Sequence, residues 1–299
     1  MDRAVLRRSL KFLAERHYIG LDRDAAWLAG PFDLLDASQI RTALGSCASD
    51  VQILVADACE STNSVLLENG FETDAPAGPG RARFLIAEEQ TAGRGRRGRK
   101  WHSAIGQAIT CSLAVQFATP LHQLSGLPLA VGVAAARALR GAGAARLALK
   151  WPNDLLLGSA KLGGILVETR ASQGLITAVI GIGINHAVQP GLGERLRREV
   201  TSLGEWLDPL PSRNQIAGRI LRELLGTLEA FRARGLDAVR AEWSALHAHA
   251  GHTLRVRLAD GRVITGLAEG LDRDGALLLR ARSGLTSVSS GEVMSARPA

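Results

Sequence analysis

The chain contains few cysteines and no run of apolar residues that would mark a membrane segment. Its three cysteines are Cys47, Cys59 and Cys111, and their irregular spacing matches no metal-ligand pattern. Reduced thiols of a cytoplasmic protein are therefore expected. The N-terminus has no apolar stretch long enough for a signal peptide or a membrane span, so we expect no membrane partner.

The seven histidines also form no pattern that indicates a metal site. His247, His249 and His252 lie close together in the sequence, but no other ligand type accompanies them. This arrangement favours a solvated junction between two domains.

Positive charge is in excess but unevenly spread. The 299 residues carry a formal net charge of +7, and the pI is near 10.1, which permits contact with nucleic acid. Much of the excess lies in two stretches, residues 3–8 and 94–100. With 46% apolar residues, the chain is long enough for one α/β core and a small additional part.

The most informative stretch runs from Gly93 to Trp101 and holds three glycines and five cations. Glycines let backbone N–H groups approach a ligand, and guanidinium groups bind phosphate or carboxylate oxygens in pairs. The stretch therefore predicts an anion-binding loop. A solvated basic loop and a nucleic-acid patch are the alternatives for this stretch taken alone.

Two further segments are unusual. The first, residues 150–168, combines Lys150, Asn153, Asp154 and Lys161 with apolar residues, which predicts a hairpin that turns at residues 158–159 and has a polar inner face. The second, residues 178–185, is a strand with glycines at alternate positions. Such glycines indicate that a flat ligand or another backbone lies against the sheet.

The apolar pattern predicts an α/β (α+β) domain, a mixed sheet with helices on one face. The expected strands are residues 51–56, 83–88, 109–117, 147–151, 165–168 and 176–184, and the expected helices are residues 127–139 and 215–234. Strips 71–79 and 187–198 are expected to be loops, the second closing over the site. After residue 251, short alternating strands predict a small all-β, barrel-like domain, with a hairpin turn at residues 260–261.

In this order and spacing, the segments resemble the catalytic domain of biotin protein ligases, which activate biotin with ATP and attach it to a lysine of a carrier protein. The resemblance covers residue 32 to the C-terminus. It includes Ser61-Thr62-Asn63, residues 93–101, Lys-Trp-Pro-Asn-Asp at 150–154, Lys-Leu-Gly-Gly-Ile-Leu-Val-Glu at 161–168 and Gly-Ile-Gly-Ile-Asn at 181–185. The wider superfamily includes lipoate ligases and octanoyl transferases.

The resemblance implies roles for the charged residues. Catalytic roles fall to Lys161, Arg94 and Asp154, with Lys161 on the biotinyl carboxylate and phosphate and Asp154 acting on the incoming lysine or on Mg²⁺. The ATP-binding residues implied are Arg96, Arg99, Lys100, Asn153 and Asn185. No metal ligand is identified, and Mg²⁺ is expected to be held mainly by the phosphates.

The resemblance also implies a biotin pocket. Its residues are Ser61, Thr62, Asn63, Gln90, Arg94, Gly95, Arg96 and Lys161. By themselves, Ser61-Thr62-Asn63 are typical of a helix N-cap, and both roles are compatible. One departure concerns the adenine: the best-known type of family member has a tryptophan in the adenylate-binding loop that stacks on adenine. This chain has residues 199–203 there, and Trp206 lies too far along to be equated with that tryptophan.

Residues 2–13 have the spacing of an amphipathic helix with a basic face, and residues 18–28 resemble the wing of a winged helix-turn-helix. The two helices expected before them are missing, which indicates a remnant or a start set too late, so DNA binding by this chain is not expected.

The predicted division is residues 1–31, 32–250 and 251–299. The expected carrier is the biotin carboxyl carrier protein of acetyl-CoA carboxylase. A homodimer through a free sheet edge, a lipoate or octanoate ligase and a biotin-responsive repressor stay open.

Overall fold

The computed structural model describes residues 2–15, 19–28, 33–46, 51–69, 82–187, 193 and 199–298. The expected loop at residues 71–79 and nearly all of that at 187–198 lie outside these ranges, as do Tyr18 and Cys47. None of the helices within these ranges is long and apolar enough to cross a membrane.

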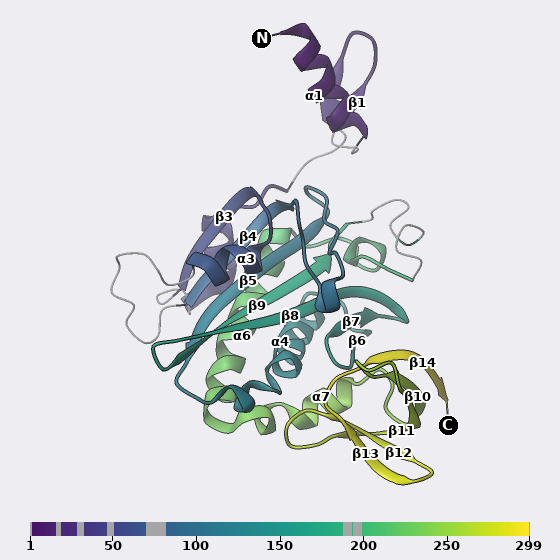
Figure 1. Cartoon of the computed structure of the whole chain (residues 1–299). Coiled ribbons are helices and arrows are strands. Elements are labelled where there is room, and N and C mark those ends of the chain that lie inside the picture. The colour runs from purple at the N-terminus through teal and green to yellow at the C-terminus, as the bar shows by residue number, and fades with distance from the viewer. Residues whose placement is uncertain are drawn as a thin grey trace.

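The largest element is a seven-stranded mixed sheet (Figure 1). In spatial order its strands are β3 (Val51–Cys59), β4 (Ala82–Gln90), β5 (Ala108–Phe117), β9 (Leu175–Asn185), β8 (Ala160–Ser172), β7 (Asp154–Leu157) and β6 (Leu147–Lys150). Strands β3 and β4 are parallel, and every other neighbouring pair is antiparallel. The predicted mixed sheet and all six predicted strands are confirmed.

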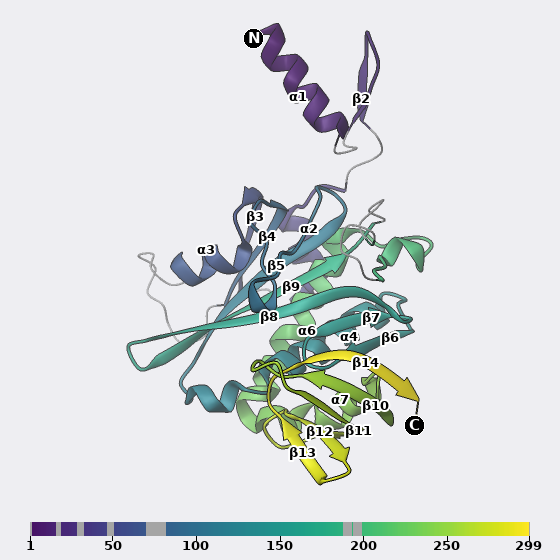
Figure 2. The ribbon, with the colours of Figure 1, turned by 45° about the vertical axis from the view of Figure 1, so that its right-hand side comes forward.

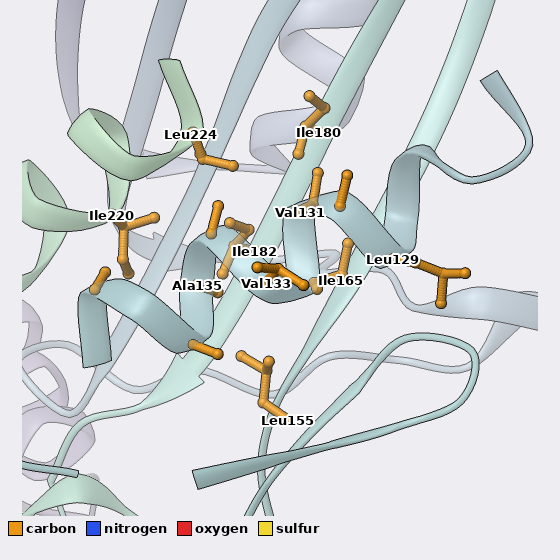
Figure 3. Packing of buried hydrophobic residues seen from close by; sticks show 14 of the residues in the cluster. Leu129, Val131, Val133, Ala135, Leu155, Ile165, Ile180, Ile182, Ile220 and Leu224 are labelled. Atoms are coloured by element: carbon orange, nitrogen blue, oxygen red, sulfur yellow. The ribbon is translucent and has the colours of Figure 1, made fainter. Parts of the chain in front are cut away.

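The main core lies between this sheet and one layer of helices. The helices are α2 (Ala37–Leu44), α4 (Leu127–Gly141), α6 (Arg213–Arg234) and α7 (Arg240–Leu246). Helix α4 is buried along nearly its whole length and packs Val131 and Ala135 against Ile180 and Ile182 of β9 (Figure 3). Small side chains on α4 let it approach the sheet closely, so the apolar residues at alternate positions of β9 are covered.

Helix α3 (Thr62–Asn69) lies on the opposite face of the sheet. Its Leu66 packs with Leu85, Ala114 and Val179, which alternate along their strands with the residues of the main core. The prediction that helices cover one face is therefore wrong for α3. The physical reason is that β4, β5 and β9 are apolar on both faces, and both faces need cover.

The start of α6 carries a buried ion pair. The Arg213 side chain is fully buried, and its Nη1 donates to Oε2 of Glu88 on β4 over 2.8 Å. The backbone N–H of Leu35 donates to the other carboxylate oxygen over 2.6 Å. A buried charge is tolerated only when it is paired and hydrogen-bonded, and both conditions hold here.

The C-terminal part is a second, five-stranded antiparallel sheet (Figure 2). Its strands are β10 (His252–Arg257), β11 (Val263–Leu271), β12 (Leu277–Ala281), β13 (Gly284–Val288) and β14 (Glu292–Pro298). The predicted small β domain is confirmed, as is its first hairpin, in which the N–H of Leu258 donates to the carbonyl of Arg262. The Trp151 indole N–H donates to the carbonyl of Gly275 over 3.2 Å and joins the two sheets.

Helix α1 (Arg3–Glu15) and the hairpin of β1 (Ile19–Leu21) and β2 (Ala26–Leu28) lie beside each other, away from both sheets (Figures 1 and 2). The expected basic helix and hairpin are thus present. Short 3-10 helices complete the described elements: η2 (Arg96–Gly98), η3 (Leu121–Leu124), η4 (Leu203–Glu205) and η5 (Gly235–Ala238).

The histidine cluster lies at the junction of the two sheets, and His247 within it is buried, not solvated as the sequence suggested. His247 follows α7 and is 8% exposed. Its ring stacks on Trp243 with 4.6 Å between centroids, and its backbone bridges to Leu149 of β6. Burial, then the nearby His249 and His252, lower the pKa of His247 to about 4.

This burial predicts a loss of stability in acid. The ordinary histidine pKa is 6.5, and the pKa of His247 in the folded chain is about 4. The full folding stability is therefore present above pH 6.5. It declines as the pH falls from 6.5 towards 4, because in this range the unfolded chain binds a proton at His247 and the folded chain does not. The loss is at most ~3 kcal/mol. Thermal melts from pH 7 to 4.5 should show a shallower decline for His247→Phe and an unchanged one for the exposed His122→Gln. Equal slopes for His247→Phe and the unaltered chain would contradict this assignment.

Candidate active site

A cavity of about 590 Å³ lies between the central sheet and the C-terminal sheet. All three segments singled out in the sequence contribute to its wall. Twelve of the thirteen predicted site residues line it: Ser61, Thr62, Asn63, Gln90, Arg94, Gly95, Arg96, Arg99, Lys100, Asn153, Asp154 and Lys161. Asn185, the thirteenth, is not in the lining.

The basic stretch forms a short hairpin over the cavity, which we call the arginine loop (residues 93–101). The N–H of Trp101 donates to the carbonyl of Gly93 over 2.9 Å, and Arg94 bridges to Lys100. At the tip Gly98 has φ +70°, which a residue without a Cβ adopts without strain. The hairpin therefore presents several cations from one compact backbone turn.

One wall of the cavity is a network of neutral polar groups. The backbone N–H of Thr62 donates to Oε1 of Gln90 over 2.8 Å. The hydroxyls of Thr62 and Ser112 are 2.7 Å apart, and the Ser112 hydroxyl donates to Oδ1 of Asn63 over 2.6 Å. Sequence reasoning missed Ser112, although the alternation of β5 puts it on the face that α3 covers.

Ser61 lies both at the start of a helix and in the cavity lining, and its contact with biotin stays a prediction. Its carbonyl accepts the hydrogen bond of the Val65 N–H at the start of α3, so it occupies the N-cap position. Ser61 is 2% exposed and lines the cavity. A helix start and a cavity wall therefore coincide at Ser61.

The alternate glycines of β9 make room for the protein's own side chains. A Cβ on Gly181 would lie 2.3 Å from Oδ1 of Asn63, and one on Gly183 would lie 2.6 Å from the Trp101 ring. Side chains, and not a second backbone, lie against these glycines, and both glycines also line the cavity, so a flat ligand beside them stays a prediction. The indole nitrogen of Trp101 is buried without a hydrogen-bond partner in the described part of the chain.

The hairpin of residues 150–168, for which the sequence predicted a polar inner face, contributes a charged pair to the cavity lining. Nζ of Lys161 contacts Oδ1 of Asp154, and both side chains are mostly buried. Nη1 of Arg96 donates to Oδ1 of Asn153 over 3.1 Å, and the Asn153 amide donates to the carbonyl of Ile165 over 2.8 Å. One guanidinium and one ammonium thus face the cavity from fixed positions.

A backbone bridge fixes the position of Lys161. Its N–H donates to the carbonyl of Glu199 over 3.1 Å, and its carbonyl accepts from the N–H of Thr201 over 3.0 Å. Asn185 belongs to this support, because its amide donates to the carbonyl of Thr201 over 2.9 Å. In the structure Asn185 holds the chain beside Lys161, and its contact with ATP stays a prediction.

Trp206 is not among the residues that line the cavity, and its ring makes contacts elsewhere. Its indole N–H donates to the hydroxyl of Thr201 over 2.9 Å, and the Arg146 guanidinium lies 5.3 Å from its ring centroid. A Cβ on Gly158 would come within 3.0 Å of the ring, so the indole packs on the turn between β7 and β8. Trp206 therefore braces the chain that follows Val200.

Two acidic residues of the site were missed by sequence reasoning. Glu292 of β14 contacts Arg99 and lies 3.2 Å from Arg257, and these contacts, with that of Arg99 first, lower the pKa of its carboxyl. No local signal could indicate this pairing across 193 residues. Glu168 lies 2.7 Å from Arg94, and its alternation with the cavity-lining Gly164 along β8 was a usable signal.

The sequence and the fold both match proteins of known chemistry. The profile of the biotin/lipoate A/B protein ligase family matches residues 56–185, and that of the biotin protein ligase C terminal domain matches residues 253–294. The bifunctional ligase/repressor BirA of Escherichia coli is 35% identical over 272 residues, 89% of this chain and 79% of that protein.

The matches to two other relatives include nearly the whole length of each relative. The biotin–acetyl-CoA-carboxylase ligase of Mycobacterium tuberculosis is 34% identical over 271 residues, 88% of this chain and 96% of that protein. The structure of the Aquifex aeolicus biotin protein ligase with biotin and ATP superposes with a TM-score of 0.65 at 27% identity, over 84% of this chain and 100% of that one.

Proposed function

Because this chain belongs to the biotin protein ligase family, we propose that it uses ATP to attach biotin to a lysine of a biotin carboxyl carrier protein. In the first half-reaction the biotin carboxylate attacks the α-phosphate of ATP, which forms biotinyl-5′-AMP and releases pyrophosphate. In the second, the lysine amine attacks the activated carbonyl and releases AMP. The observation that carries the proposal is a single cavity that is lined both by neutral amides and hydroxyls and by several cations.

The cations reduce the charge repulsion that opposes the first half-reaction. A carboxylate and a triphosphate repel each other, so their approach needs fixed positive charge. Lys161, Arg94 and Arg96 are assigned to the carboxylate and the α-phosphate, and Arg99 and Lys100 to the remaining phosphates. Lys161 is the central residue because its backbone is held on both sides by residues 199–201.

Asp154 is assigned to the second half-reaction. A lysine must lose its proton before it attacks, and a carboxylate beside the mixed anhydride accepts that proton or orients the ammonium. Asp154 contacts Lys161, so it lies next to the group that holds the reacting carboxylate.

Neutral groups recognise the ureido ring of biotin in this proposal. Ser61, Thr62 and Gln90, with the Gly95 backbone, supply donors and acceptors beside apolar surface. Lipoate and octanoate lack such a ring, which favours biotin over either acid.

Mg²⁺ is assigned to the triphosphate. Asp154 and Asn153 supply oxygen donors of the kind that Mg²⁺ prefers, and Asp154 is already paired with Lys161. The metal would therefore arrive with ATP and neutralise its phosphates, while the protein's own residues orient the two substrates.

The assignment of the carrier follows from the name of the Mycobacterium tuberculosis relative, which points to the carrier subunit of acetyl-CoA carboxylase. A homodimer through the outer edge of β3 is part of the same expectation. DNA binding is not proposed; the name of the Escherichia coli relative includes a repressor, and of the predicted winged helix the described residues contain α1 and the β1–β2 hairpin.

The test is exchange of labelled pyrophosphate into ATP by the purified chain with Mg²⁺ and biotin, with lipoate and octanoate assayed in parallel. We expect exchange with biotin alone. Exchange with lipoate would indicate a lipoate ligase instead. The absence of exchange with all three acids would contradict the assignment as an adenylating enzyme.

A further inference from the structure

Ser112 lies behind the neutral wall of the cavity, by which we mean Thr62, Asn63 and Gln90. It is fully buried within β5, and it does not itself line the cavity. Its hydroxyl oxygen lies 2.7 Å from the hydroxyl oxygen of Thr62 and 2.6 Å from Oδ1 of Asn63. A hydroxyl has one hydrogen to donate and two lone pairs with which to accept. The direction of these two contacts therefore decides what Thr62 offers to a ligand.

The Asn63 side chain fixes the direction of the first contact. Its Nδ2 lies 3.2 Å from the backbone carbonyl of Leu166 and 2.8 Å from Oε2 of Glu168. A carbonyl or an ionised carboxylate accepts hydrogen bonds and donates none, so the atom that faces them is the amide nitrogen. The amide oxygen then faces Ser112, and an amide oxygen only accepts. The single hydroxyl hydrogen of Ser112 is therefore donated to Asn63.

Because its hydrogen is used, Ser112 acts as an acceptor toward Thr62. The Thr62 hydroxyl hydrogen has two acceptors within the protein, the Ser112 oxygen at 2.7 Å and Oε1 of Gln90 at 3.2 Å. The Gln90 atom is the amide oxygen, because the backbone N–H of Thr62 also donates to it, over 2.8 Å. In both cases the hydrogen stays within the protein. Thr62 therefore presents only oxygen lone pairs to the cavity that it lines.

We propose that Ser112 is a positioning residue that sets the polarity of the neutral wall: it keeps the Thr62 hydroxyl as an acceptor, so that the site requires an N–H donor on its acid substrate. This inference rests on the proposed function. Biotin meets the requirement, because its cyclic urea carries N–H donors. An acid with a ring oxygen in place of that N–H would bring two acceptors face to face and leave both unpaired.

The kinetic test compares biotin with its two cyclic carbamate analogues, in each of which one ring N–H is replaced by oxygen. For the unaltered chain, we expect kcat/KM in pyrophosphate exchange to be roughly tenfold or more higher for biotin than for at least one carbamate. In Ser112→Ala the Thr62 hydroxyl is released from its shorter contact and turns to donate to a ring oxygen. The preference for biotin over that carbamate should therefore fall roughly threefold or more, and the KM for ATP should stay within about twofold.

Three further variants separate this effect from a loss of packing. Ser112→Thr keeps the hydroxyl and should keep the preference of the unaltered chain. Thr110→Val removes another buried hydroxyl of β5, one that donates to the carbonyl of Ala87 over 3.0 Å, and should leave the preference unchanged. In a Thr62→Val background, Ser112→Ala should change the preference by less than about twofold, because no hydroxyl is left to turn.

A second readout does not depend on activity and serves if Ser112→Ala does not fold. Neutron diffraction from deuterated crystals of the unaltered chain without ligands locates hydroxyl hydrogens, which X-ray diffraction at ordinary resolution does not show. We expect the Ser112 deuterium to point at Oδ1 of Asn63. The Thr62 deuterium should point at Ser112 or at Gln90.

A Thr62 deuterium directed into the cavity would overturn the proposal. So would equal use of biotin and both carbamates by the unaltered chain, or an unchanged preference in Ser112→Ala. Equal falls in Ser112→Ala and Thr110→Val would also contradict it, since they indicate general damage to the fold. If the unaltered chain shows no exchange with biotin, the proposed function fails, whereas the neutron structure still decides the direction of the hydrogen bonds.

Discussion

Lys161→Ala should reduce the rate of biotin-dependent pyrophosphate exchange by about 10²- to 10³-fold, the size of effect seen when one fixed donor to a developing charge is removed. Lys161 is 17% exposed and contacts Asp154, so no solvent cation replaces it readily. Its backbone bridge to residues 199–201 does not involve the side chain. The fold should therefore survive the substitution, and the loss should appear in the rate.

The measurement is initial-rate exchange with saturating biotin and ATP, with thermal melts to confirm folding. Lys11→Ala, on α1 away from the cavity, is the matched lysine control and should leave the rate unchanged. Asp154→Asn, assayed in parallel, should slow transfer to the carrier more than exchange. An exchange rate for Lys161→Ala within twofold of the unaltered chain would remove this residue from the catalytic set.

The largest stability effect is expected at Arg213, where replacement by methionine should lower the free energy of unfolding by about 3–5 kcal/mol. The Glu88 carboxylate would remain buried with the Leu35 N–H but without a countercharge. Leaving one charge of a buried pair unpaired costs far more than removing both. Urea unfolding followed by circular dichroism gives the difference.

Two companion variants separate this effect from ordinary packing loss. The double variant Arg213→Met with Glu88→Leu should recover most of the stability, because no uncompensated charge is left. Arg137→Met removes one partner of the half-exposed pair with Glu242 and should cost under about 1 kcal/mol. Similar losses for Arg213→Met and Arg137→Met would contradict the buried-pair interpretation.

Local patterns predicted the central elements well. The run of apolar residues at 176–184 predicted β9, observed as Leu175–Asn185, and the glycine turn at 158–159 separates β7 from β8 as expected. The cations of residues 93–101 belong to one short hairpin. These features depend on neighbours within a few residues, which is the range over which sequence patterns carry information.

Other features could not be read from local patterns. Strands β4, β5 and β9 are apolar on both faces, so periodicity did not show that α3 covers the second face. Histidines at 247 and 249 looked solvated because nothing nearby in the sequence reveals the packing of Trp243 and β6 around them. Asn185 matched a motif, yet its amide supports the chain beside Lys161.

The sequence by itself determined the strands, the cationic loop and the kinds of chemical group that the site contains. Only the tertiary structure decided which groups are paired: Glu168 with Arg94, Glu292 with Arg99 and Glu88 with Arg213. The physical reason is that local conformation depends on steric and periodic constraints along the chain. The charge environment of a side chain depends on burial and on partners that, here, lie 74 to 193 residues away.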